Sequence, residues 1–227
     1  MKRPMQTGSM LIELAASVAV LGLLAAISFG VLQDVTRARQ GHAANALANQ
    51  ARELILQFAL AHGRLPCPDL SGNGGEGDAS GNCPDGQRYG LLPTRALGME
   101  GDSAQAAGRQ LRYGVFRNAP DADLGSGFGG ATKDTDPTTR FLAQAEHAAA
   151  YPVATDQPYV PKLDAKGLAT NCDAPGDNPA FIVSAGAPEQ LGSTACFPTP
   201  NPERSASISM GRHELVGWIR SKFRAAN

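Results

Sequence analysis

The chain begins with a short polar segment and then becomes almost entirely apolar. Lys2 and Arg3 lie in the opening segment, and an apolar run follows from Met10 to Val31 with a single carboxylate, Glu13. About 20 apolar residues in a helix are long enough to cross the roughly 30 Å hydrocarbon core of a bilayer. Because flanking basic residues stay on the cytoplasmic side, the pattern predicts a membrane-spanning helix with the rest of the chain outside.

The helical pattern continues beyond this apolar run. No proline occurs between Gln33 and His62, and apolar residues recur there at three- and four-residue steps. These residues are Leu47, Ala51, Leu54, Ile55 and Phe58. A stripe of this kind predicts one buried helix face that packs on a globular domain, and Pro66 marks the end of the helix.

The rest of the chain alternates short regular segments with polar loops. Two segments are rich in β-branched or aromatic residues and predict strands, at 110–117 and 180–184. Residues 141–150 predict a short helix. Residues 213–223 predict a second helix, which we expect to dock on the sheet through Leu215, Trp218 and Ile219.

The four cysteines are Cys67, Cys83, Cys172 and Cys196. They follow the apolar run and are therefore expected in an oxidising compartment, where disulfides persist. Four cysteines allow three pairings. We favour Cys67–Cys83 with Cys172–Cys196, because each bond closes a local, flexible loop. Zinc is the alternative, but no Cys-x-x-Cys or Cys/His spacing supports it.

The segment between the first two cysteines is rich in glycine, acidic and amide residues, and it offers a candidate calcium site. Asp69, Ser71 and Asn73 occupy positions one, three and five of an EF-hand-like loop. The twelfth position lacks the usual glutamate, and Glu76 and Asp78 would supply charge instead. A glycine-rich surface loop that needs no metal is the alternative interpretation.

The residues from Gly8 to Glu13 read Gly-Ser-Met-Leu-Ile-Glu and directly precede the long apolar run. This segment resembles the class III leader of type IV pilins and type II secretion pseudopilins. The resemblance implies cleavage by a prepilin peptidase between Gly8 and Ser9 and methylation of the new amine of Ser9. It also implies that Glu13 serves assembly as the fifth residue of the mature chain, although the family usually has phenylalanine where this chain has Ser9. Charge attraction to the freed amine, in the same chain or a neighbour, gives Glu13 a physical role.

The resemblance implies a pilin-like α+β fold. A long N-terminal α-helix, transmembrane in its first half, would pack on a small antiparallel β-sheet domain with long disulfide-bonded loops. The expected boundaries are a prepilin leader at 1–8, a transmembrane and assembly helix at 9–32, the periplasmic half of the helix at 33–63 and a globular periplasmic domain at 64–227. The expected location is the bacterial inner membrane, with a single span and a periplasmic C-terminal domain, and then the pilus or pseudopilus.

The function implied is that of a minor pilin or pseudopilin that assembles through its N-terminal helix into a type IV pilus or a type II secretion pseudopilus. The partners implied are prepilin peptidase, other pilins or pseudopilins, the inner-membrane assembly platform and the lipid bilayer. A binding module at the filament tip, such as an adhesin or a DNA-uptake pilin, is the alternative.

Charge and motif content argue against other classes. The formal net charge is -1, which excludes a strongly basic surface, so no nucleic-acid partner is expected. Arg212, Arg220, Lys222 and Arg224 form a small basic cluster, which we interpret as a solvated helix face. The 4 histidines are scattered without spaced carboxylate or cysteine partners, so no enzyme is expected.

Overall fold

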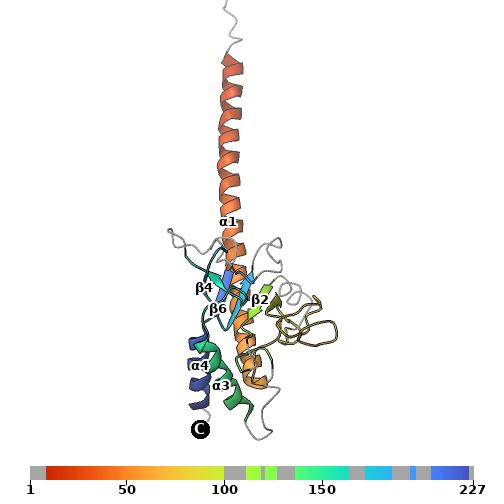
Figure 1. Cartoon of the computed structure of the whole chain (residues 1–227). Helices are drawn as coiled ribbons and strands as arrows, with labels where there is room; N and C mark the ends of the chain where they lie inside the picture. The colour runs from red at the N-terminus through yellow and green to blue at the C-terminus, as the bar shows by residue number, and fades with distance from the viewer. Residues whose placement is uncertain are drawn as a thin grey trace, which may run out of the picture.

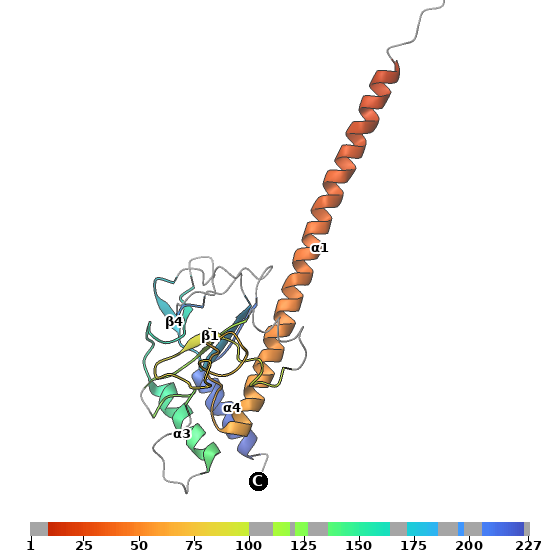
Figure 2. The same ribbon diagram turned by 90° about the vertical axis from the view of Figure 1, so that its right-hand side faces the viewer.

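A single long helix and a smaller body make up the described part of the chain. The computed structural model describes residues 9–99, 111–118, 121–126, 136–163, 172–185, 195–197 and 206–224, without the side chains at 9–13, 22–38, 40 and 223–224. Helix α1 runs from Ser9 to His62 and projects far beyond a body of sheet, loops and two shorter helices (Figure 1). The view turned by 90° shows the same projection (Figure 2).

The prediction that the first half of α1 is transmembrane is wrong. Within the described residues, the structure contains no helix with the length and apolar character that a membrane span requires. The apolar side chains described near the start of α1 extend from Leu14 to Leu21. The long apolar N-terminal helix of the expected fold class and the single-pass inner-membrane location with a periplasmic domain are therefore both corrected.

The second half of α1 belongs to the body. Ala51 and Ile55 are fully buried, Phe58 is almost so, and this face of α1 packs against the sheet. The stripe of apolar residues predicted a buried face here, and that prediction is confirmed. The helix ends at Gly63, which has a φ of 61° and donates its N–H to the carbonyl of Ala59. Glycine adopts this left-handed conformation without the penalty that other residues incur, which makes it a frequent helix terminator.

An antiparallel sheet lies against this face of α1. Within the described residues it has four strands in the order β1-β2-β5-β6. They are β1 (Tyr89–Leu91), β2 (Leu111–Val115), β5 (Phe181–Ala185) and β6 (Ala206–Met210). The register places Tyr113 opposite Val183 and Val183 opposite Ile208. The two predicted strands are β2 and β5, and they occupy the centre of the sheet, where their apolar residues are buried.

A smaller antiparallel pair and two helices complete the body. The pair is β3 (Val160–Pro161) with β4 (Pro175–Asp177). The helices are α3 (Pro137–Ala150) and α4 (Arg212–Arg224), which correspond to the two helices predicted in the second half of the chain.

The C-terminal helix α4 packs mainly against α3 and not, as expected, on the sheet. Leu215 and Ile219 of α4 are buried, and they share one core with apolar residues of α1, the sheet and α3. Arg52 of α1 also reaches α4, with an Nη2 to Oε1 distance of 3.1 Å to Glu214. The apolar face of α4 was predicted correctly, but its neighbour was not.

Candidate functional site

The first candidate site is the projecting part of α1. Leu14, Val18, Val20 and Leu21 are 67, 60, 58 and 65 % exposed. Leu14, Val18 and Leu21 follow steps of four and three residues, so their side chains lie along one face of the helix. A row of exposed apolar side chains on a helix is a surface that gains free energy when another apolar surface covers it.

The leader residues lie at the border of the described structure. Gly8 lies outside the described residues. Ser9 begins α1 and Glu13 lies in its second turn, but their side chains are not described. Cleavage after Gly8, methylation of Ser9 and the assembly role of Glu13 therefore stay predictions.

The second candidate site is the loop closed by the first disulfide. Disulfides join Cys67 to Cys83 and Cys172 to Cys196, which confirms the favoured pairing. Closing a loop of about 15 residues stabilises a fold by about 3 kcal/mol in the chain-entropy description. The 67–83 loop follows the end of α1 and pairs with β1 through the backbones of Asp69 and Leu91.

The carboxylate of Asp69 organises the first turn of this loop. Its Oδ1 accepts the backbone N–H groups of Ser71 and Gly72 at 2.8 and 2.9 Å and the Ser71 hydroxyl at 2.9 Å. Its Oδ2 accepts the N–H of Gly74 at 2.7 Å. Asp69 is buried, and converging N–H dipoles compensate its negative charge in the way that a cation otherwise would.

Other residues of the candidate calcium loop also use their side-chain oxygens to accept backbone N–H groups of the protein. Asn73 Oδ1 accepts the N–H of Gly75, and Asp78 Oδ1 accepts two N–H groups of its own turn. Across the described ranges, no group of three or more His, Cys, Asp or Glu side chains is placed to hold a metal ion. Calcium binding at Asp69, Ser71, Asn73, Glu76 and Asp78 stays a prediction.

Glu76 connects the loop to the end of α1. Its carboxylate binds Arg64 through both oxygens, with Nη1 to Oε1 at 2.6 Å and Nη2 to Oε2 at 2.8 Å. Oε1 also accepts the backbone N–H of Cys67 at 2.6 Å. The guanidinium of Arg64 lies 5.0 Å from the ring centre of Phe58 in the last turns of α1. The loop is thereby held to the helix by charge-assisted hydrogen bonds in addition to the disulfide.

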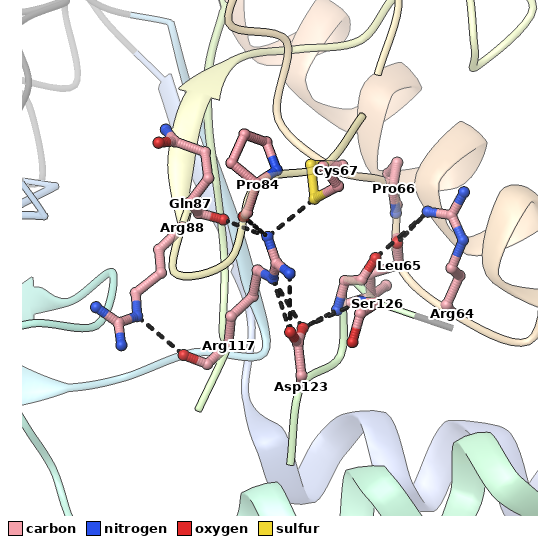
Figure 3. A network of polar contacts seen from close by, with 12 residues as sticks. Arg64, Leu65, Pro66, Cys67, Pro84, Gln87, Arg88, Arg117, Asp123 and Ser126 are labelled. Carbon is pink, nitrogen blue, oxygen red and sulfur yellow. Dashed lines mark hydrogen bonds and ion pairs between the residues drawn. A yellow bond between two sulfur atoms is a disulfide. The ribbon is translucent and has the colours of Figure 1, made fainter. Parts of the chain in front are cut away.

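A buried arginine holds the other end of the loop (Figure 3). Arg117 Nε and Nη2 donate to the two carboxylate oxygens of Asp123 at 2.8 and 2.9 Å. Its Nη1 donates to Cys83 Sγ, to the carbonyl of Pro84 and to the carbonyl of Gln87, each at 2.9 Å. The Arg117 and Asp123 side chains are 1 and 13 % exposed. Sequence reasoning missed this network, because Cys83 and Gln87 are 34 and 30 positions from Arg117.

The backbone around Arg117 is fixed as well. Gln157 accepts the N–H of Arg117 and donates to its carbonyl, at 3.0 and 2.7 Å. Arg88 Nε also donates to that carbonyl, at 2.9 Å. The backbone of Arg117 is therefore held in place, and so are the partners of its guanidinium. This makes the side chain a rigid anchor for the loop.

The second disulfide is tied to the sheet by a different arginine. Arg112 of β2 is buried, and its Nη1 donates to the carbonyl of Cys196 at 2.7 Å. Its guanidinium lies 4.0 Å from the ring centre of Phe197, a cation–π contact. Burial lowers the pKa of Arg112 below its usual value. On the other side, Tyr159 donates its hydroxyl to the carbonyl of Cys172 at 2.8 Å.

The C-terminal basic cluster does not form one open patch. Arg212 is buried, where its Nη1 donates to the carbonyl of Ala148 at 2.7 Å, and burial lowers its pKa. Arg220 forms an ion pair with Glu146 of α3 at 2.6 Å. Lys222 is exposed. The side chain of Arg224 lies outside the described part. Two of the four basic residues therefore hold α4 to α3.

The two candidate sites differ in what they can do. The exposed face of α1 can bind another apolar surface, and the polar network around Arg117 and Glu76 can hold a loop and a disulfide in place. Comparisons of the chain with models of protein families, with curated proteins and with solved structures found no match.

Proposed function

We propose that the chain is a minor pilin or pseudopilin, a subunit that assembles through α1 into a type IV pilus or a type II secretion pseudopilus. One observation carries the proposal. The α1 helix, which includes the end of the Gly8 to Glu13 segment, buries one face of its second half in the core, while its projecting part exposes aligned apolar side chains at Leu14, Val18 and Leu21. This arrangement suits a subunit whose helix is covered by the helices of neighbouring subunits.

The free energy available from such packing is substantial. Burying one Val or Leu side chain that was exposed contributes about 1.5–3 kcal/mol. Because the exposed residues repeat at helical spacing, one neighbouring helix can cover several of them at once. The body would then lie outside the bundle of helices, since α1 continues into it without a break.

The charges of Glu13 and of the freed amine of Ser9 would set how far neighbouring helices are shifted along their axes. A positive amine and a carboxylate one helical turn apart attract each other when water is excluded, and either partner left alone among apolar helices is unfavourable. Pairing between neighbouring subunits therefore favours one axial offset over others. The partners proposed are prepilin peptidase and other pilins or pseudopilins.

Processing is the first test. The full chain is produced in cells with an active prepilin peptidase, and the mass of the product is measured. The proposal expects a mature chain that begins at Ser9, with or without a methyl group on its amine. The control is the same chain produced with an inactive peptidase, which keeps Met1. A chain that keeps Met1 in the presence of the active peptidase would contradict the proposal.

Assembly is the second test, and the chain offers a matched control. Leu14 on α1 is 67 % exposed and Leu163 on the body is 68 % exposed, so Leu14→Arg and Leu163→Arg place the same charge at equally exposed apolar positions. The expected result is that Leu14→Arg loses incorporation into the sheared filament fraction of the host, while Leu163→Arg retains it. Equal incorporation of both variants would refute a role for the projecting face.

A further inference from the structure

The two sulfurs of the first disulfide lie in different surroundings. Cys67 is buried, and its backbone N–H is held by Glu76 at 2.6 Å. Cys83 is only half-buried, and its Sγ accepts a hydrogen bond from Arg117 Nη1 at 2.9 Å. Of the two cysteines, Cys83 is therefore the more exposed residue, and its sulfur faces a guanidinium.

The guanidinium contact has a chemical consequence when the disulfide is open. The thiolate, not the thiol, attacks disulfides, and a neighbouring cation or N–H donor favours the thiolate. Asp123 neutralises part of the charge of Arg117, but it binds the Nε and Nη2 edge. The Nη1 group stays directed at Cys83 Sγ and at two carbonyl oxygens. The nearby ion pair of Arg64 with Glu76 is neutral as a unit and adds little net field.

The loop has enough contacts to hold both cysteines before the bond exists. Asp69 forms backbone hydrogen bonds in both directions with Leu91 of β1, each at 2.9 Å. Glu76 ties Cys67 to Arg64, and Arg117 ties Cys83 to Asp123. These contacts do not depend on the covalent bond, so they keep the two sulfurs together in the reduced chain.

We propose that Cys83 is the nucleophilic thiolate through which the folded chain closes the Cys67–Cys83 disulfide, by exchange with an external disulfide of a small thiol or of an oxidoreductase. Arg117 acts as a positioning residue that favours the thiolate. Cys67 is the resolving thiol, which needs no access to solvent because it attacks from inside the protein.

The exchange has two steps. The Cys83 thiolate attacks one sulfur of the external disulfide, which forms a mixed disulfide at Cys83 and releases the first external thiolate. Cys67 then attacks Cys83 Sγ, which forms the Cys67–Cys83 bond and releases the second external group, and the proton of Cys67 passes to this departing sulfur so that it leaves as a thiol. Two cysteines are oxidised, and one external disulfide is reduced to two thiols.

The test uses the full chain with Cys67→Ser, which leaves Cys83 as the only free cysteine and keeps the second disulfide. The rate of alkylation by iodoacetamide is measured against pH, in buffer and again in denaturant. The midpoint of this profile reports thiolate formation and is independent of how accessible the sulfur is. We expect the midpoint in the folded protein to lie at least about one pH unit below that of the unfolded chain, within the range that basic neighbours cause.

Two further measurements test whether Arg117, and not folding in general, lowers the midpoint of Cys83. The Cys196→Ser variant leaves the exposed Cys172 as the free thiol, and its midpoint should stay near the ordinary value of about 8.5. In the Cys67→Ser/Arg117→Gln variant, checked for folding by circular dichroism, the midpoint of Cys83 should return toward that value. Should this variant unfold, the comparison of Cys83 with Cys172 decides alone.

Trapping of the intermediate completes the test. Oxidised glutathione added to the folded Cys67→Ser protein should give one glutathione on Cys83, seen by mass spectrometry, and should react there faster than with Cys172 in the Cys196→Ser protein at neutral pH. Equal midpoints for Cys83 in the folded and unfolded states would overturn the proposal. So would a Cys67→Ser chain that does not fold, since the proposal requires the loop to form before the bond.

Discussion

Arg117 and Asp123 are six positions apart and meet as a buried bidentate pair, with the two contacts at 2.8 and 2.9 Å. The third nitrogen of the same guanidinium reaches Cys83 and the turn that follows it. One side chain therefore links the end of β2, the Asp123 turn and the disulfide loop. Removing Asp123 leaves the charge of the buried Arg117 without its carboxylate partner.

The Asp123→Ala variant should lose about 3–5 kcal/mol of its free energy of unfolding, because breaking a buried ion pair leaves the other charge unpaired. Urea denaturation measures this loss. The control is Glu146→Ala, which breaks the pair with Arg220, whose side chains are 41 and 58 % exposed. That change should cost about 0–1 kcal/mol. Similar losses in the two variants would show that the Arg117 pair is not the anchor inferred from its burial.

Gly77 and Gly81 should respond differently to the same substitution. Both have positive φ, 70° and 80°. A Cβ on Gly77 would overlap the carbonyl oxygen of Asn82, whereas one on Gly81 would meet nothing within 4 Å. Gly81→Ala should therefore cost only the backbone term of about 1–2 kcal/mol. Gly77→Ala should cost clearly more and displace the loop, as measured by thermal unfolding of both variants. Equal melting temperatures would contradict the close approach at Gly77.

Glu76 should protect the backbone of the loop at Cys67. Glu76→Ala removes the acceptor for the Cys67 N–H and for Arg64, and the loss of charged hydrogen bonds should cost about 1.5–3 kcal/mol. Glu76→Gln keeps one carbonyl oxygen for the N–H and should cost less. Hydrogen exchange of the Cys67 amide is the measurement, with fast exchange expected in the alanine variant alone. Unchanged exchange in that variant would argue against this role.

Asp136, which caps the start of α3, should make the free energy of unfolding depend on pH in the acid range. The pKa of Asp136 is lowered, first by the hydrogen bond from the backbone N–H of Thr139 and then by its contacts with Thr138. A carboxyl whose folded pKa lies below its unfolded value of about 3.9 stabilises the fold above that pH and loses this effect as the pH falls through the folded pKa.

Asparagine caps helices nearly as well but does not titrate. The Asp136→Asn variant should therefore match the wild type near neutral pH and lose less stability below about pH 4. Urea denaturation at several pH values measures both profiles. Parallel profiles would show that the cap does not contribute to acid sensitivity.

The central strands and the helices could be predicted from the sequence, because each has enough apolar residues at the right period. Tyr113 and Val183 lie in such segments. Strand β6 could not, since Ala206–Met210 alternates serine with apolar residues over only five positions and lies at the edge of the sheet. The apolar face of α4 was visible in the sequence, but a periodic face does not tell which neighbour covers it.

The candidate sites show the same division between local and long-range information. The disulfide pairing was predictable, because nearby cysteines in flexible loops find each other first. The calcium interpretation stays a prediction, and the sequence did not show that the oxygens of Asp69 accept backbone N–H groups of its own loop. The Arg117 network could not be predicted, since Cys83 and Arg117 are 34 positions apart and become neighbours only in the folded chain.

The unbroken course of α1 also fixes the angular phase between its exposed stripe and the body. Each residue of a helix turns the chain by about 100°, so one residue inserted between Leu21 and Gly41 would rotate the Leu14 face by about 100° relative to Ile55. Seven inserted residues would restore the original azimuth to within about 20°. The number of residues in the projecting part of α1 thus sets the direction in which the body faces, and the helix can lengthen with little change of that direction only by particular numbers of residues, such as about seven or about eleven.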